Sequence, residues 1–139
     1  MEMETETIYG QVIPKSNNYM TVPNDNGHGG RRLIKNKAMH EYEKSFCLQC
    51  RKYRGRRISS NFRLYCVVYQ RSKRFDLDNS IKTILDCLQY VGAITDDNLC
   101  VEIVAKKRVD KANPRVEYGL QEVVTEQSLF ELHDSYNRR

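Results

Sequence analysis

Apolar and polar residues alternate most regularly between Phe62 and Gln70, where Phe62, Leu64, Cys66 and Val68 fall on one side of an extended chain. Such alternation predicts a strand with one buried face and one more exposed face. Less regular patterns predict three further strands, at residues 8–13, 99–108 and 115–124. The short turn between the last two predicts that they form an antiparallel hairpin.

Two segments carry apolar residues at helical spacing instead. The first runs from Asn36, a candidate N-cap, to Tyr53. The second runs from about Asp78 to Val91, and Gly92 after it supplies a left-handed residue that can end a helix. The apolar positions are Ala38, Met39, Tyr42, Phe46 and Cys50 in the first segment and Ile81, Ile84, Leu85, Leu88 and Val91 in the second.

The resulting order, β-α-β-α-β-β, predicts an α/β (α+β) fold with a small mixed four-stranded sheet and helices packed on it. A chain of 139 residues is long enough for one domain with its own hydrophobic core. We place this domain at residues 8–124. Residues 1–7 are expected to be a disordered N-terminus, residues 24–30 a loop, and residues 125–139 a C-terminal tail or short helix.

The net charge of +5 is unevenly distributed along the chain. Residues 31–74 contain fourteen Lys or Arg and two acids, whereas the remainder is acidic. A basic block beside an acidic cluster favours a phosphate-binding surface around a metal site, although a solvated basic face is the plainer alternative. The basic clusters are Arg51, Lys52, Arg54, Arg56 and Arg57, followed by Arg71, Lys73 and Arg74.

Several classes of protein are disfavoured by composition. No run of 18 apolar residues is present, so no membrane association is expected. The acidic N-terminus has no apolar segment typical of a signal peptide. Five cysteines, an odd count without framework spacing, favour a reducing, cytoplasmic location. The lone Cys47 and Cys50 pair favours packing over a zinc site.

The first candidate functional residues lie where the second predicted helix begins. Asp76 and Asp78 are two residues apart, so in extended chain both carboxylates can point to one place. Mg²⁺ prefers such oxygen ligands and needs only one or two protein carboxylates beside water and a substrate phosphate. Asp78 could instead be only the N-cap of the helix. A calcium loop is excluded, because Ile81 and Cys87 stand where that loop needs glycine and glutamate.

Further candidates follow on the same helix and beyond it. Lys82 is four residues after Asp78 and can stabilise negative charge on a phosphate, or can be merely a surface ion pair. Asn79 can orient a ligand. Asp96 and Asp97 precede the next strand, and we expect Asp97 to reach the Asp76 and Asp78 carboxylates if that strand returns beside the preceding one. An ordinary polar turn is the alternative.

These residues together resemble the RusA family of Holliday junction resolvases (crossover junction endodeoxyribonucleases). The resemblance covers residues 8–124 and rests on Asp76-Leu-Asp-Asn-x-x-Lys82, Leu85-Asp86-x-Leu88 and Gly92-x-x-x-Asp96-Asp97. The segment from Pro14 to Asn18 is similar to the family's N-terminal turn. Three features depart from the family pattern: Lys15 at the second proline, the lack of an aromatic residue in 93–95, and the loop at 21–32.

The resemblance implies a homodimeric, Mg²⁺-dependent endonuclease, with Mn²⁺ as a possible substitute, that cuts four-way DNA junctions by paired nicks in recombination and repair. It also implies the role of each matching residue. The metal ligands would be Asp76, Asp78 and Asp97, the catalytic lysine Lys82, the supporting residues Asn79, Asp86 and Asp96, and the DNA contacts Lys15, Asn17, Arg51, Arg54, Arg56, Arg57, Lys73 and Arg74. The alternatives are a nuclease for other branched DNA and a junction-binding module without catalysis.

Overall fold

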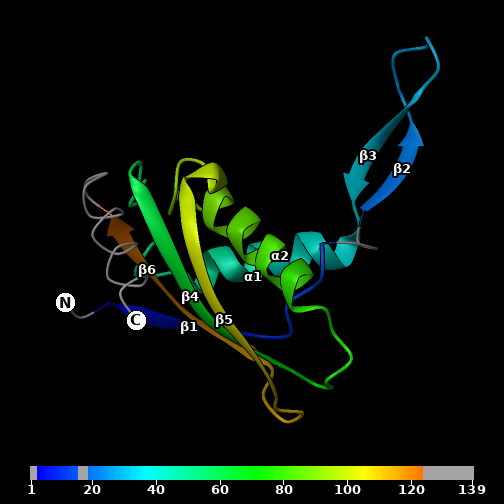
Figure 1. Ribbon diagram of the computed structural model, residues 1–139. Coiled ribbons are helices and arrows are strands. Elements are labelled where there is room, and N and C mark those ends of the chain that lie inside the picture. The colour runs from blue at the N-terminus through cyan, green and yellow to red at the C-terminus, as the bar shows by residue number, and fades with distance from the viewer. Residues whose placement is uncertain (1–2, 16–18, 124–139) are drawn as a thin grey trace, which may run out of the picture.

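The computed structural model describes residues 3–15 and 19–123. Its centre is a four-stranded sheet in the order β1-β6-β4-β5 (Figure 1). β4 pairs antiparallel with β6 and parallel with β5, so the predicted mixed sheet is confirmed. The strands are β1 (Thr5–Tyr9), β4 (Asn61–Gln70), β5 (Cys100–Val109) and β6 (Arg115–Val123).

Two helices, α1 (Lys37–Gln49) and α2 (Leu77–Tyr90), pack on one face of this sheet. The alternating residues of β4 confirm the predicted pattern, because Phe62, Leu64 and Val68 are fully buried. They meet Phe46 from α1 and Ile84 from α2 in one hydrophobic core. This packing fixes both ends of α2 relative to the ends of β4 and β5.

The predicted hairpin of the last two strands is wrong, because β4 lies between them. α2 carries the chain from the end of β4 back to its beginning, so β5 pairs with β4 in parallel. The following turn then passes the end of β4, where the Asp110 backbone N–H donates to the Gln70 carbonyl oxygen at 2.9 Å. A short connection therefore joins two strands that are not neighbours.

A separate two-stranded ribbon, absent from the predicted elements, consists of β2 (Tyr19–Pro23) and β3 (Arg31–Lys35). The loop predicted at residues 24–30 is its tip. Figure 1 shows the ribbon projecting from the body beside the start of α1. We call residues 19–35 the arm.

Other boundaries differ from the prediction by a few residues. The first strand runs from Thr5 to Tyr9 rather than over residues 8–13, so part of the N-terminus expected to be disordered belongs to β1. The strand ends at Tyr9 because Gly10 turns the chain at φ 108°. α1 begins after the predicted N-cap Asn36 but ends at Gln49, so the basic cluster follows the helix instead of closing it. Gly92 is left-handed at φ 74°, as predicted. The predicted C-terminal helix lies outside the described residues. No helix in the described ranges is long and apolar enough to cross a membrane.

Candidate metal centre and nucleic-acid interface

The first acidic pair stands at the start of α2, beyond the carboxyl end of β4. Asp76 occupies the N-cap position, but its side chain makes no capping hydrogen bond. Its Oδ2 instead accepts from Asn79 Nδ2 at 3.2 Å, while its backbone carbonyl accepts the first helical bond from Ser80 N. Asp78 lies in the first turn, so the reading of Asp78 as the N-cap is wrong. The Asp76 carboxylate is therefore available for another role.

The carboxyl groups of Asp76 and Asp78 interact directly. A hydrogen bond and the like charge of Asp78 raise the pKa of Asp76, and the hydrogen bond from Asp76 lowers the pKa of Asp78. Both side chains are exposed to solvent. Two adjacent carboxylates that compete for one proton form an oxygen donor set suited to a divalent cation, which would relieve their repulsion.

Two lysines lie beside this pair. Lys82 Nζ is 3.9 Å from Asp78 Oδ2, one helical turn further on. Lys107, from the carboxyl half of β5, lies 3.5 Å from the carbonyl oxygens of Lys73 and Phe75 and 5.4 Å from the centre of the Phe75 ring. Lys107 therefore supports the loop that presents Asp76, and its charge opposes the rise in the pKa of that carboxyl group.

Sequence reasoning missed Lys107, although a signal was present. In the predicted strand it shares its side of the chain with Ile103 and Ala105, and in the sheet it is in register with the buried Val68. A lysine on the core side near the end of a strand usually extends its amine beyond the sheet toward a polar partner.

The second acidic pair lies at the other end of α2. Asp97 begins the short 3₁₀ helix η1 (Asp97–Leu99), and its backbone N–H donates to Gln89 Oε1, in the last turn of α2, at 3.1 Å. Asp96 caps η1 through a 2.9 Å bond from Asn98 N. A helix of 14 residues is about 21 Å long.

One chain therefore does not bring Asp97 to the Asp76 and Asp78 carboxylates, contrary to our expectation. The reason is the parallel pairing of β5 with β4. Because the two strands run in the same direction, the start of β5 lies beside the start of β4, far from the end of β4 that leads to Asp76. Within residues 3–15 and 19–123, no three His, Cys, Asp or Glu side chains form a group that could hold a metal.

The expected supporting acid Asp86 has a different partner. Its Oδ2 lies 3.0 Å from Lys15 Nζ, so a predicted supporting residue and a predicted DNA contact neutralise each other. The same N-terminal segment is held to α2 by a 2.6 Å bond from Thr83 Oγ1 to the Ile13 carbonyl oxygen. Asn17, also expected to contact DNA, lies outside the described residues.

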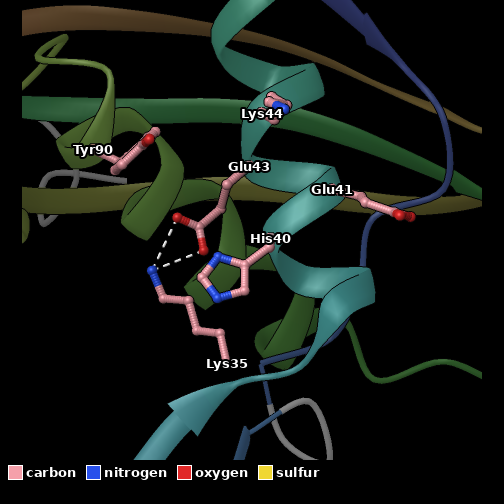
Figure 2. Close-up of a pocket in the computed structure, with 6 residues that line it drawn as sticks. All are labelled: Lys35, His40, Glu41, Glu43, Lys44 and Tyr90. Carbon is pink, nitrogen blue, oxygen red and sulfur yellow. Dashed lines mark hydrogen bonds and ion pairs between the residues drawn. The ribbon is translucent and has the colours of Figure 1, made fainter.

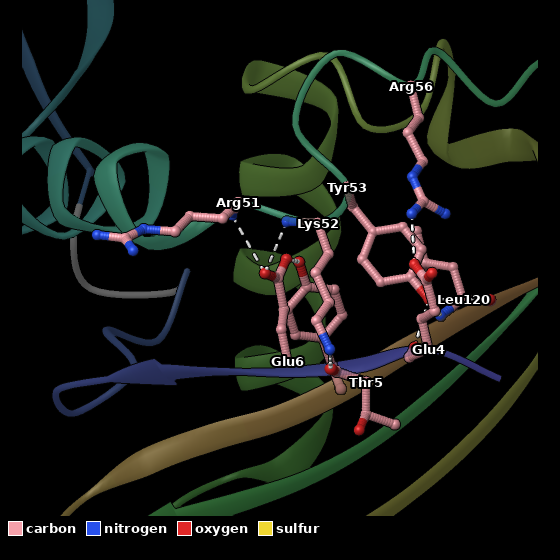
Figure 3. Close-up of polar contacts among 9 residues, drawn as sticks. Glu4, Thr5, Glu6, Arg51, Lys52, Tyr53, Arg56 and Leu120 are labelled. Carbon is pink, nitrogen blue, oxygen red and sulfur yellow. Dashed lines mark hydrogen bonds and ion pairs between the residues drawn. The ribbon is translucent and has the colours of Figure 1, made fainter.

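The basic segment after α1 is partly used in packing. The backbone N–H groups of Arg51 and Lys52 donate to Glu6 at 3.1 and 3.0 Å, and Arg56 forms an ion pair with Glu4 (Figure 3). All three of these basic side chains remain exposed. Lys52 Nζ also donates to the Thr5 carbonyl oxygen at 2.7 Å, so Lys52 and Arg56 hold the fold with their charged groups, whereas Arg51 does so through its backbone alone.

The remaining basic candidates lie at two ends of the sheet. Arg57 is exposed, and its backbone N–H donates to the Gly92 carbonyl oxygen at 2.8 Å, next to the loop that carries the second acidic pair. Arg54 donates to the Cys47 carbonyl oxygen at 3.0 Å and so binds the last turn of α1. Lys73 and Arg74 are exposed directly before the first acidic pair. Each acidic pair thus has a basic segment beside it.

A pocket of about 400 Å³ lies between the root of the arm, α1 and the end of α2 (Figure 2). Its charged centre is an ion pair between the buried Glu43 and Lys35, 2.7 Å apart. Lys35 also lies over the Tyr90 ring, 6.0 Å from its centre. Neither acidic pair lines this pocket, whose remaining lining residues are His40, Glu41 and Lys44.

Comparison with known proteins gives one family. A model of that family, described as "Endodeoxyribonuclease RusA", matches residues 10–120, which include both acidic pairs, Lys82 and Lys107. A search among curated proteins gave no match. Because the matched region covers most of the chain and contains the whole candidate site, this protein belongs to the RusA family of endodeoxyribonucleases.

Proposed function

We propose that this protein is a Mg²⁺-dependent, structure-selective endodeoxyribonuclease that resolves four-way DNA junctions by paired nicks during recombination and repair. The observation that carries this proposal is the exposed Asp76 and Asp78 pair at the start of α2, with Lys82 beside it, in a chain of the RusA family. We further propose a cytoplasmic location, in line with the free state of all five cysteines.

Asp76 and Asp78 would hold the Mg²⁺ ion, and Mn²⁺ could replace it. When bound, the ion supplies Lewis acidity, which lowers the pKa of water and stabilises the departing oxygen of a phosphodiester. Asn79 keeps the Asp76 carboxylate in place through its side-chain hydrogen bond. Lys82 adds positive charge where the phosphate gains negative charge in the transition state. Lys107 orders the loop before the pair.

We propose that Asp97 completes this centre from a second subunit. β5 is an edge strand, and within the described residues no strand pairs with its outer side. The first acidic pair lies near its carboxyl end and Asp97 directly before its amino end. Antiparallel pairing of two β5 strands about a two-fold axis would bring Asp97 of each subunit toward the first pair of the other, giving two equal sites.

The surface of β5 supports such self-pairing. Its amino-terminal half exposes Val101, Ile103 and Val104, each more than 40% accessible. Its charges are also complementary when the strand is reversed: Glu102 lies near one end, and Lys106 and Arg108 lie near the other. Two sites on a two-fold axis would give the two symmetric cuts that junction resolution needs.

Basic residues near the two acidic pairs would bind the DNA backbone without sequence preference, so binding should weaken steeply with salt. The predicted basic contacts are Lys15, Arg51, Arg54, Arg56, Arg57, Lys73 and Arg74, and the polar Asn17 is a further predicted contact. Supporting roles remain proposed for Asp86, through its ion pair with Lys15, and for Asp96, through its cap on η1.

The test is incubation of the purified protein with a synthetic immobile four-way junction and with linear duplex, in Mg²⁺ or in EDTA. Paired nicks across the junction in Mg²⁺ alone support the proposal, and the Asp76→Asn variant should bind the junction without cutting it. Preferential cutting of a Y-fork would instead favour a nuclease for other branched DNA. Binding without cutting in both Mg²⁺ and Mn²⁺ would favour a junction-binding module and overturn the proposed chemistry.

A further inference from the structure

The arm is the part of the described chain that the proposed chemistry does not use. Its two strands form a sheet of their own, in which Thr21 pairs with Leu33 and Val22 with Arg32. A two-stranded ribbon is at best marginally stable in water by itself. The ribbon projects from the body, so its stability depends on contacts at its root, and its exposed surface is a candidate binding surface (Figure 1).

The root of the arm is fixed to the body. Lys35, the last residue of β3, forms the ion pair with buried Glu43 at 2.7 Å. The next residue, Asn36, caps α1 by accepting a hydrogen bond from Met39 N at 3.0 Å. No linker separates the arm from α1, so the direction of the arm follows from the direction of the helix (Figure 2).

The tip is a closed turn despite its glycines. The Asn24 backbone N–H donates to the Gly30 carbonyl oxygen at 3.2 Å, and Asn24 Nδ2 donates to the Gly29 carbonyl oxygen at 3.3 Å. Arg32 and Asp25 form an ion pair at 3.2 Å across it. Gly30 has φ 82°, a left-handed conformation that favours glycine. Two hydrogen bonds and an ion pair therefore close the tip.

One face of the arm combines an apolar side chain with a fixed cation. Leu33 is 65% exposed, and strand alternation places it on the same side of β3 as Arg31 and Lys35. The Arg31 guanidinium donates to Thr21 Oγ1 at 3.1 Å and to the Thr21 carbonyl oxygen at 2.9 Å, which holds it beside Leu33. Residues 19–35 contain three Lys or Arg and one acid. Because Arg32 is paired with Asp25 and Lys35 with Glu43, this face presents the Arg31 charge beside an apolar side chain.

We propose that the arm enters the branch point of the DNA substrate, where Leu33 packs against exposed bases and Arg31 contacts a phosphate. This inference rests on the proposed function. A two-stranded ribbon is narrow enough to enter a DNA groove, and apolar wedges of this kind open base steps in other proteins. A branch point favours such insertion because its bases have already lost part of their stacking. The Arg31 charge favours the phosphate backbone of DNA over a second copy of the arm, which carries the same charge at the same place.

The test compares two exposed leucines. Leu33→Ala removes the proposed wedge, and Leu48→Ala removes a 69% exposed leucine from α1 as the matched control. Both are made in full-length Asp76→Asn protein to prevent cutting. The probe is a four-way junction with 2-aminopurine at the branch point. Binding should raise its fluorescence with the native arm and with Leu48→Ala. Leu33→Ala should lose most of that rise and bind the junction about tenfold more weakly, with linear duplex little affected.

A second variant, in which residues 24–30 are replaced by Asn-Gly, should behave like Leu33→Ala because the shortened arm no longer reaches the branch point. Equal fluorescence and affinity for the native and both altered arms would overturn the inference and leave the proposed function intact. A change from dimer to monomer on shortening would assign the arm to a second copy and also overturn it. Failure of the native-arm protein to bind any junction would overturn the proposed function itself.

Discussion

Asp76 and Asp97 stand at opposite ends of α2, one at its N-cap position and the other bonded through its backbone N–H to Gln89 in the last turn. The helix between them acts as a spacer of about 21 Å. Each end of one subunit therefore offers part of a metal centre, and two subunits in opposite orientation could combine the parts. Whether a complete metal centre forms therefore depends on the number of subunits.

Mixing two inactive variants tests whether the parts combine across subunits. We expect Asp76→Asn and Asp97→Asn each to abolish Mg²⁺-dependent nicking. After the two are unfolded together in equal amounts and refolded, about half of the dimers should be mixed, and each mixed dimer should contain one intact site. Single-nick activity should then return to about a quarter of the wild-type level, measured on a labelled junction.

The control for this experiment is a mixture of Asp76→Asn with Asp78→Asn. Both changes fall in the same half of the centre, so no mixed dimer has an intact site and activity should stay absent. Activity that fails to return in the first mixture, although the dimers have exchanged, would place all three carboxylates of a site in one subunit and contradict the arrangement proposed here.

The second prediction concerns dimerisation through the outer edge of β5. Val104 lies near the middle of the strand and is 42% exposed, so antiparallel self-pairing would place the two copies close together. Val104→Glu would set like charges opposite each other, which disfavours pairing. We expect sedimentation velocity to show a shift from dimer to monomer. Leu48→Glu, on exposed α1 surface, should leave the dimer unchanged. Monomers from both variants, or from neither, would contradict dimerisation through the outer edge of β5.

Lys107 should matter for cutting more than its position outside the motif suggests. Lys107→Met removes the amine that holds the loop before Asp76 and a positive charge beside its carboxyl group. We expect kcat to fall by about 10- to 100-fold with little loss of junction affinity. Lys111→Met removes the same charge from the nearby turn and should change kcat by less than about twofold. Similar losses for both lysines would mean that only the overall charge counts.

Glu6 should make stability depend on acid pH. Burial raises the pKa of this carboxyl group, but hydrogen bonds from the Tyr118 hydroxyl and from the backbone N–H groups of Lys52 and Arg51 outweigh it, so the net pKa is lowered. A lowered folded-state pKa contributes stability above the unfolded value of about 4.3, and that stability is lost as the pH falls through the folded value. Glu6→Gln should therefore cost about 1–2 kcal/mol at neutral pH.

Urea unfolding of both proteins measures this effect. The difference in free energy of unfolding should shrink as the pH falls below about 4, because the wild-type carboxylate is then progressively protonated. Glu41→Gln is the matched change on exposed α1 surface, where the ion pair with Lys37 is 3.8 Å long, and should cost less than about 0.5 kcal/mol. A pH-independent difference for Glu6→Gln would show that shape, and not charge, is lost.

The sequence predicted those parts of the fold that depend on local periodicity. Alternation identified β4 because one side of it faces the core, and the apolar stripe identified α2, with Gly92 at its end. The arm was missed because a ribbon without a core shows no apolar periodicity, so only its glycine-rich tip was recognisable as a loop. Local patterns also gave no information on which strands are neighbours.

In the candidate site, too, local spacing predicted some residues, and strand pairing decided the positions of the others. Asp76, Asp78 and Lys82 lie within seven residues, so their proximity could be predicted from spacing along a strand end and a first helical turn. The position of Asp97 depends on whether β5 runs parallel or antiparallel to β4, which no local pattern contains. The position of Lys107 near the first acidic pair depends on the same pairing of β5 with β4. Long-range pairing, and not residue chemistry, limited the prediction of the site.

The order β1-β6-β4-β5 also has a consequence for synthesis on the ribosome. The segment from β4 through α2 to β5 can form as soon as residue 109 has emerged, since its strands are direct neighbours. β1, made first, has no place in the sheet until β6 lies between it and β4. Glu6 and its partners on β6 and after α1 must wait for the same event. The sheet is therefore completed by β6, the last strand within the described residues, so nascent chains that stop before residue 115 would lack a closed core.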